Sequence, residues 1–420
     1  NIRVHKGQLF ATTGYWRDEP GTNPVSGPHI LRKDSINSNW VADITFDAMV
    51  SPQLRRHLRI SSLESLIFTK DTLGNDISSP DTLLIAGVDD AFGLGVRVRN
   101  DQNGTYETAV ISVGSDPFGQ YNIIRSMIKY TDPLTGGEFL YVGGRSSIYK
   151  GWYDASEPSK LRFSSSPVFL FPTSATRVTS MTIANDKLYA GCGSEQNIAG
   201  GIWEKDTATD HFSLVYQLPF PGSNLSSNIR GLTTIPSQNG SAYFDILFSF
   251  EGTGDIIRLE PRNNFNSTVE INIPDYFDTI PNTYSTNLAA YNEMTPFQDQ
   301  RIIGLGVTNA TAMGEIDETP PNNGTYFLVR NQDASYTHHY VYDTFRPVAV
   351  GENLRVVRTV CISPFDTNNV YLGGFDAGGG TSQHNTAWIY KGTLQDIVSG
   401  IEDTEYQPLD LKLYPNPAKN

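Results

Sequence analysis

The chain has only two cysteines, Cys192 and Cys361, among its 420 residues. A small fold stapled by disulfides needs several closely spaced pairs, so this class is excluded. Both cysteines lie in apolar runs that read as strands, which predicts two buried thiols packing as small hydrophobic side chains.

Basic residues are also scarce, because 31 Lys and Arg stand against 45 Asp and Glu and give a formal net charge of −14. Such a surface repels nucleic acid and anionic membranes, so neither is expected as a partner. The densest basic patch, at residues 55–59, contains three arginines and one histidine, and we expect it on a solvated strand or turn.

No apolar run approaches the roughly 20 residues that a membrane-spanning helix needs. The chain opens without a secretory signal peptide, which predicts a cytosolic protein or one that has already been processed. Long amphipathic helical patterns are missing as well, whereas Tyr and Phe, with 21 each, suit pleated and half-buried surfaces. These features indicate an all-β protein.

What the sequence does contain is a recurring unit, seen clearly at residues 187–203 (KLYAGCGSEQNIAGGIW). A short apolar strand, usually ending in glycine, is followed by a polar loop and then by a strand that carries an aromatic residue or arginine. Seven such glycine-type strands are predicted, at residues 8–14, 82–87, 138–144, 187–191, 243–250, 301–306 and 369–374. Seven units in 420 residues correspond to 420/7, or about 60 residues each.

Each unit also offers candidate flanking strands, and this predicts a seven-bladed β-propeller of four-stranded antiparallel blades. The propeller is expected to cover residues 1–400, and an array of two-sheet sandwiches is the alternative. The first unit has only seven residues ahead of it, and the last lacks a clear fourth strand. We therefore expect residues 1–5 to pair with the last blade, or part of the first blade to lie upstream.

Two units resemble kelch-like blades, with a double glycine followed by an aromatic on the next strand. These are residues 138–144 with Trp152, and residues 369–374 with Trp388. Residues 363–371 and the GGIW at 200–203 are similar to the propellers of xyloglucanase-type glycosidases. Neither pattern runs through the whole chain, so the resemblance implies the fold and not an activity.

The tail, residues 401–420, is predicted to be a linker and the start of a second domain. Its LYPNP sequence at 413–417 resembles the opening of the C-terminal sorting domain of the Bacteroidetes type IX secretion system. The resemblance implies contact with that secretion machinery, export across the outer membrane, and a secreted or cell-surface location. Short Asp-Ser/Thr-aliphatic (or Ala) patterns resemble the O-glycosylation sites of that phylum, and they mark Ser35, Thr72, Thr82, Thr207 and Thr279.

Four arginines occupy the same place in four units, at the start of the predicted innermost strand: Arg125, Arg177, Arg230 and Arg358. Repeated around a ring, they would form a collar at the mouth of the central channel. Guanidinium groups bind carboxylate, sulfate or phosphate with two parallel hydrogen bonds. One hypothesis is therefore an anion-binding face; the other is that these arginines tie neighbouring blades together through the acidic loops.

Loops from several blades converge on this face, and they supply further candidates for a binding site. These are Tyr15, Trp16, Asp89, Asp90, Glu195, Glu251, Asp255, Asp376 and His384. Asp89 and Asp90 are adjacent, so on a strand they would point in opposite directions. Acid–base chemistry would then need a partner from another blade.

The histidine pair His338–His339 is expected on an outermost strand, facing solvent, and no familiar catalytic motif is present. No cofactor is predicted, although oxygen-rich turns at 101–104 and 376–380 make Ca²⁺ a candidate. The sequence favours a binding module for an extracellular glycan or a surface protein. A carbohydrate-active enzyme and a structural subunit of a surface assembly are the alternatives.

Overall fold

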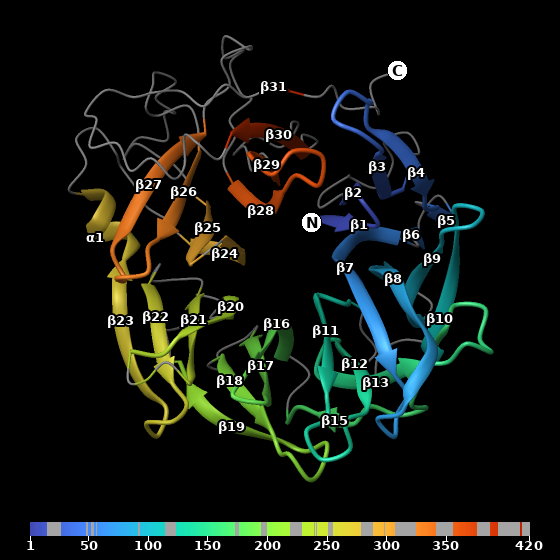
Figure 1. The fold of residues 1–420 in the computed structure, drawn as a ribbon, viewed down its shortest axis with the longest axis horizontal. Helices are drawn as coiled ribbons and strands as arrows, with labels where there is room; N and C mark the ends of the chain where they lie inside the picture. Colours follow the sequence, from blue (N-terminus) through green and yellow to red (C-terminus); the bar gives the residue numbers. More distant parts are fainter. Residues whose placement is uncertain are drawn as a thin grey trace.

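Apolar strands alternate along the chain with short polar turns, and consecutive strands pair antiparallel. In the computed structural model they form seven blades arranged in a ring around a central axis (Figure 1). The structure describes residues 1–14, 27–47, 49–51, 54–55, 57–90, 93–113, 123–172, 176–194, 200–218, 229–238, 240, 242–250, 255–278, 289–297, 299–306, 325–341, 356–375, 387–393 and 412–413. The predicted fold class is therefore confirmed.

The strands of the first three blades follow one another in chain order. Blade 1 consists of β1 (Ile2–His5), β2 (Gln8–Thr12), β3 (His29–Lys33) and β4 (Val41–Thr45). Blade 2 consists of β7 (His57–Lys70), β8 (Asp76–Asp90), β9 (Gly93–Asn100) and β10 (Thr105–Val113). Blade 3 consists of β11 (Ser126–Thr131), β12 (Glu138–Gly143), β13 (Ser147–Tyr153) and β14 (Leu161–Phe163), with the short β15 (Phe169–Leu170) also on β13.

The remaining four blades repeat this order. Blade 4 consists of β16 (Thr176–Ala184), β17 (Lys187–Ser194), β18 (Gly201–Lys205) and β19 (Phe212–Gln217). Blade 5 consists of β20 (Ile229–Pro236), β21 (Phe244–Phe250), β22 (Asp255–Glu260) and β23 (Asn266–Asn272). Blade 6 consists of β24 (Ala289–Phe297), β25 (Gln300–Gly306), β26 (Thr325–Arg330) and β27 (Tyr336–Val341). Blade 7 consists of β28 (Val356–Ile362), β29 (Asn369–Phe375), β30 (Ala387–Thr393) and β31 (Lys412–Leu413).

Two small elements complete the described chain: a hairpin of β5 (Met49–Ser51) and β6 (Leu54–Arg55), and one helical turn, α1 (Ile273–Asp278). No helix among the described residues is long and apolar enough to cross a membrane.

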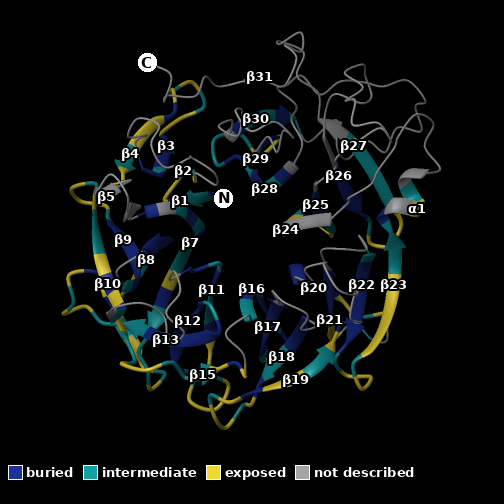
Figure 2. Cartoon of the chain, turned by 180° about the vertical axis from the view of Figure 1, so that it is seen from behind, coloured by how far each residue is buried: buried dark blue, intermediate teal, exposed yellow. Residues whose placement is uncertain are grey.

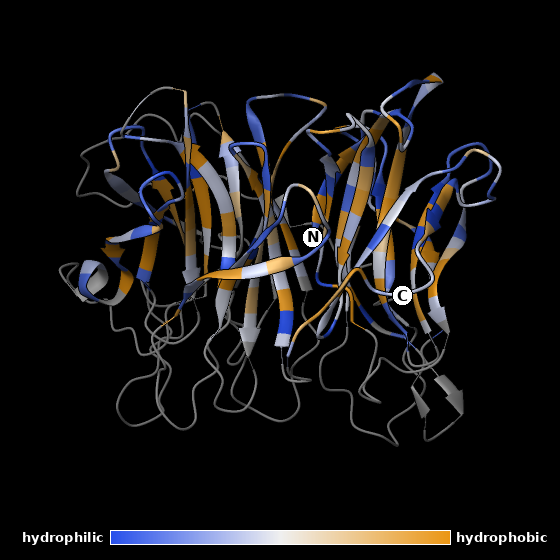
Figure 3. Cartoon of the chain, turned by 90° about the horizontal axis from the view of Figure 1, so that it is seen from below, coloured by the Kyte–Doolittle hydropathy of each residue, from blue (hydrophilic) through white to orange (hydrophobic). Residues whose placement is uncertain are grey.

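The first strand of each blade lies innermost and contacts the first strands of the neighbouring blades (Figure 1). Buried side chains form seven hydrophobic clusters, and each cluster lies between one pair of adjacent blades. Exposed residues concentrate on outermost strands such as β10 and β23 (Figure 2), and hydrophilic residues on the turns (Figure 3). Because blades stack face to face, both faces of a blade are buried, and this burial is the main source of stability.

Recurring glycines stand where two blades approach most closely. A Cβ on Gly191 would lie 2.6 Å from Cγ2 of Ile229, and one on Gly87 would lie 2.6 Å from Cγ2 of Ile124. Each contact is with the residue beside or at the start of the next innermost strand. At these two positions the glycine that marks the unit in the sequence is thus a site of close packing between blades.

The ring closes differently from the prediction. Residues 1–5 do not pair with the last blade, because β1 is the innermost strand of blade 1 and pairs with β2. A tight turn joins them, with positive φ at both Lys6 (47°) and Gly7 (80°), as in a two-residue hairpin turn. Blades 1 and 7 pack face to face like the other neighbours, and Ile2, Tyr371 and Cys361 share the hydrophobic cluster between them.

The last blade takes its fourth strand from the tail, since β31 pairs with β30 through Leu413 and Tyr390. This strand lies in the segment that we predicted to be a linker. The boundary between residues 400 and 401 itself stays a prediction.

The seven predicted glycine-type strands are confirmed as β2, β8, β12, β17, β21, β25 and β29. Cys192 and Cys361 are buried and unpaired by any disulfide, as expected. The prediction that the basic patch is solvated is wrong for His57 and Arg59, the two side chains of the patch that the structure describes. His57 is buried and Arg59 is half-buried, because both face carboxylates at the end of β8.

Candidate functional site

The four predicted collar arginines come to the same end of the innermost strands. Arg177 and Arg230 are the second residues of β16 and β20, Arg358 is the third residue of β28, and Arg125 stands just before β11. The identical direction of these strands in the ring brings their first residues to one mouth of the central channel.

The electrostatics of Arg125 show how closely the guanidinium groups gather. Burial, followed by the positive charges of Arg59, Arg230 and Arg177, holds its pKa well below the usual value, while the carboxylate of Asp89 opposes this shift. The buried Nε of Arg125 has no hydrogen-bond partner among the described residues. A buried cation in this setting is stabilised by an anion placed next to it.

Arg59 is a member of this cluster that we did not predict. It is the third residue of β7, the same place that Arg358 has in β28. Its Nε donates a hydrogen bond of 2.6 Å to Oδ2 of Asp89. We missed it because the apolar pattern of the sequence predicts an innermost strand only from residue 64, seven residues after β7 begins at His57.

Asp89 and Asp90 were predicted on a loop, but they are the last residues of β8, and both are buried. Ser61 Oγ donates to Asp89 Oδ1 over 3.1 Å, and burial raises the pKa of Asp89. Asp90 points the other way, towards Arg97 Nη2 at 3.2 Å and His57 Nε2 at 3.3 Å. Asp89 therefore belongs to the arginine cluster, whereas Asp90 belongs to the interior of its own blade.

Hydroxyl groups on the innermost strands link five of the seven pairs of neighbouring blades. Thr179 Oγ1 lies 2.6 Å from the carbonyl oxygen of Ile229 in the following blade. Equivalent contacts involve Ser62 with Ile124 (3.3 Å), Ser126 with Val178 (3.4 Å), Thr295 with Val360 (3.1 Å), and Thr359 with the N–H of Ile2 (3.1 Å). Hydroxyls thus join the blades at the channel, and the Arg59–Asp89 ion pair lies within one blade.

Of the remaining loop candidates, the structure describes Asp255 alone. Tyr15, Trp16, Glu195, Glu251, Asp376 and His384 lie outside the described residues. Asp255 begins β22 and is half-buried, and its Oδ1 accepts a hydrogen bond of 2.6 Å from Asn272 Nδ2.

The predicted glycosylation positions occur mainly in turns. Thr72 and Thr207 follow aspartates whose side chains organise the turn: Asp71 Oδ1 accepts from the N–H of Leu73 (2.9 Å), and Asp206 Oδ1 from the N–H of Ala208 (2.9 Å). This turn chemistry by itself accounts for an Asp at these places. Ser35 lies in an exposed turn and Thr82 lies on β8, while Thr279 is outside the described part of the chain.

His338 and His339 lie on the outermost strand of blade 6, as predicted, but neither simply faces solvent. His338 Nδ1 lies 3.1 Å from the hydroxyl of Tyr276, and the ring of His339 stacks on Phe327 with centroids 5.0 Å apart. Both rings are half-buried by these neighbours.

Metal binding finds little support in the described residues, which contain no group of three His, Cys, Asp or Glu able to hold an ion. In the oxygen-rich turn at 101–104, the Asp101 carboxylate faces Lys6 Nζ at 2.6 Å and Arg99 Nη1 at 2.6 Å. Two cations at this distance disfavour Ca²⁺ there.

Comparison with known proteins finds solved structures with a similar fold. No protein-family model and no curated protein matches the chain. A crystal structure of a protein from Lactobacillus plantarum superposes with a TM-score of 0.50 at 10% identity, covering 93% of both chains. The Dos1 propeller gives 0.44 at 12% identity over 87% of this chain and 86% of that one. NanB sialidase from Streptococcus pneumoniae gives 0.40 at 10% identity over 94% of this chain and 68% of that one. At these identities the likeness concerns the fold alone.

Proposed function

We propose that this protein is a binding module whose channel mouth holds an anionic group of an extracellular glycan or of a protein partner. The observation that carries the proposal is Arg125, a half-buried residue whose buried Nε has no hydrogen-bond partner among the described residues, and whose pKa is depressed by burial and by Arg59, Arg230 and Arg177. A carboxylate or sulfate entering this mouth would supply the missing negative charge and accept hydrogen bonds from several guanidinium groups.

The carboxylates described near the arginine cluster favour binding over glycoside hydrolysis. Hydrolysis of this type uses two carboxyl groups on either side of the scissile bond. The carboxylate of Asp89 opposes the lowered pKa of Arg125, and it is already bonded to Arg59. A single, paired carboxylate suits a counter-ion for the cluster better than an acid–base pair.

The proposal predicts that the protein binds sulfated or uronic polysaccharides, such as dextran sulfate or polygalacturonate, better than neutral dextran. The double variant Arg125→Ala with Arg230→Ala should weaken this binding at least about tenfold, because each lost charge-assisted hydrogen bond is worth about 1.5–3 kcal/mol. Biolayer interferometry at two salt concentrations measures the affinity and its electrostatic part.

The matched control is Arg162→Ala. Arg162 lies on β14 and its side chain is 58% exposed, so its removal should leave binding unchanged. Circular dichroism checks that the double variant stays folded. Equal affinity of the wild type and the folded double variant would refute the anion site.

We further propose that the protein works outside the cell, either secreted or attached to the surface, and that its tail engages a secretion system. The LYPNP sequence begins at Leu413, where β31 ends, and this supports a functional boundary there. Fractionation of the producing cells tests the location, and a protein confined to the cytosol would contradict it.

A further inference from the structure

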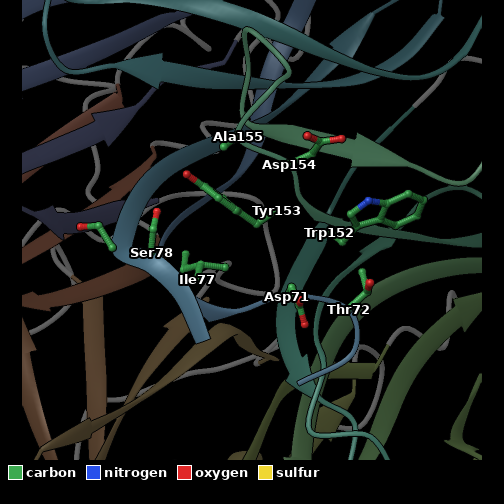
Figure 4. A pocket seen from close by; sticks show the side chains of 9 residues that line it. Asp71, Thr72, Ile77, Ser78, Trp152, Tyr153, Asp154 and Ala155 are labelled. Atoms are coloured by element: carbon green, nitrogen blue, oxygen red, sulfur yellow. The ribbon is translucent and has the colours of Figure 1, made fainter. Parts of the chain in front are cut away.

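A hollow of about 400 Å³ lies between blades 2 and 3, far from the arginine cluster (Figure 4). It is formed by the turn that joins β7 to β8, by the first residues of β8, and by the end of β13 with the turn that follows it. Arg59 stands at the start of β7 and this turn follows its end, so the hollow and the channel mouth lie at opposite ends of the strand. It is therefore separate from the anion site.

The aromatic part of the wall is Tyr153, whose ring lies over Ile77 and Ser78 in Figure 4. Trp152 precedes it on β13 and borders the hollow, but its ring points the other way and packs on the cluster between blades 3 and 4. Tyr153 is fixed by stacking on Phe68, with ring centroids 5.9 Å apart. The wall thus offers rigid apolar surface that requires no rearrangement to receive a ligand.

Two carboxylates stand on opposite rims, each held by the backbone of its own turn (Figure 4). Asp71 accepts hydrogen bonds from Asn75 Nδ2 (3.0 Å) and from the N–H groups of Leu73 and Asn75. Asp154 accepts from the N–H (3.0 Å) and the hydroxyl (2.6 Å) of Ser156. These bonds, led by those of Asn75 and Ser156, lower the pKa of both carboxyl groups.

The arrangement selects against charged ligands of either sign. The nine lining residues include no lysine or arginine, so two ionised carboxylates repel an anion. A cation gains little, because most acceptor positions of both carboxylates are already used and Arg162 Nη1 lies 3.5 Å from Asp154 Oδ2. Free acceptor positions on these oxygens, together with the hydroxyls of Thr72 and Ser78, are suited to neutral O–H groups.

We infer that this hollow is a binding site for an uncharged sugar unit. The sugar's hydroxyls would bond to the carboxylate rims and to the serine and threonine hydroxyls, while its C–H face would lie against the aromatic wall. The volume is at the lower end of the roughly 300–1,000 Å³ that small-molecule sites occupy. The site goes beyond the anion-binding function and does not depend on it.

Saturation-transfer-difference NMR with galactose, glucose, mannose, glucosamine and glucuronate tests the inference. We expect at least one of the three neutral sugars to bind, and to bind more tightly than glucosamine or glucuronate. Ser78→Trp should weaken this binding at least tenfold by filling the hollow, and Ser79→Trp gives a second, independent blocking variant. Both serines are exposed, so neither change alters the core.

Ser165→Trp is the matched control, because Ser165 is also exposed but does not line the hollow. Unchanged binding in this control and in Arg125→Ala, with loss in both blocking variants, supports the site and separates it from the anion site. The inference is overturned if no neutral sugar binds, if a charged sugar binds more tightly, or if the folded Ser78→Trp and Ser79→Trp variants bind like the wild type.

Discussion

At the scale of single residues, buried charges are paired across blade boundaries. Asp43 on β4 accepts a hydrogen bond of 2.7 Å from Arg99 Nε and one of 2.9 Å from the hydroxyl of Tyr106, both in blade 2. The same carboxylate–arginine–tyrosine arrangement joins blades 5 and 6 through Glu270, Arg330 and Tyr336. These contacts fix how one blade sits on the next, because a buried charge without its partner costs several kcal/mol.

Asp101 gives such a contact a pH dependence. Burial alone would raise its pKa, but hydrogen bonds from Lys6, Arg99 and His5 outweigh burial and lower it from 3.8 to about 2. A lowered carboxyl pKa adds stability that is present above the unfolded value and is lost as the pH falls through the folded value. The wild type should therefore lose on the order of 2 kcal/mol of unfolding free energy from this group between about pH 4 and pH 2.

Asp101→Asn should remove this contribution, so that the variant is less stable than the wild type at pH 7 and the difference shrinks towards pH 2. Urea unfolding at a series of pH values measures it. Asp76→Asn is the control, since the Asp76 carboxylate is 84% exposed. A constant difference between wild type and Asp101→Asn from pH 7 to pH 2 would contradict the assignment.

At the scale of elements, innermost strands are joined by side-chain hydroxyls and not by backbone ladders. Thr179 on β16 shows the arrangement well, because it is buried and its Oγ1 lies 2.6 Å from Ile229 O and 3.1 Å from Gly191 O. Each blade is a separate sheet, and within the described residues only single backbone bridges connect neighbouring blades, at Gly14–Arg59, Arg145–Arg177 and Gly306–Val356. Hydroxyl contacts therefore supply a large share of the directional contacts around the channel.

Thr179→Val keeps the shape of the side chain but removes its hydroxyl. We expect a loss of about 1–3 kcal/mol in unfolding free energy, because the buried carbonyl of Ile229 loses its hydroxyl donor. Thr268→Val, on the exposed outer strand β23, should change stability by less than about 0.5 kcal/mol. Chemical denaturation of both variants provides the comparison, and equal effects would argue against the hydroxyl link.

The strands that could be predicted from the sequence are those whose buried side chains are apolar. The glycine-type strands stood out because the glycine and the apolar run both result from packing between blades. The start of β7 was missed because the buried His57 and the half-buried Arg59 pair with Asp90 and Asp89, and hydrophobic patterns do not show such pairing. β31 was missed because two residues carry no readable pattern.

Only part of the candidate site could be predicted from the sequence as well. The convergence of Arg125, Arg177 and Arg230 followed from their shared position in the repeat, since equal positions in equal blades meet at one mouth. The Arg59–Asp89 ion pair did not follow, because it depends on the register between β7 and β8. The hollow beside Trp152 also depends on how two blades sit together, and the sequence of one blade does not contain that information.

At the scale of the whole molecule, the ring depends on seven interfaces of similar construction, and the one between blades 7 and 1 joins distant parts of the chain. Ile2 on β1 is 1% exposed and shares a cluster with Tyr371 and Cys361 of blade 7. Its N–H donates to Thr359 Oγ1 over 3.1 Å. No strand is exchanged between the first and last blades within the described chain, so side-chain packing holds this seam.

Ile2→Ala should therefore weaken the seam more than the rest of the ring. Loss of a buried isoleucine costs about 2–5 kcal/mol, and local opening is expected first where contacts have been removed. Hydrogen exchange followed by mass spectrometry should show faster exchange in β1 and β28 while β16 and β20 keep the protection of the wild type. Ile256→Ala is the matched control, because Ile256 is equally buried but packs between blades 5 and 6. If Ile2→Ala instead accelerates exchange evenly around the ring, the seam is not an independent point of opening and the propeller unfolds as one cooperative unit.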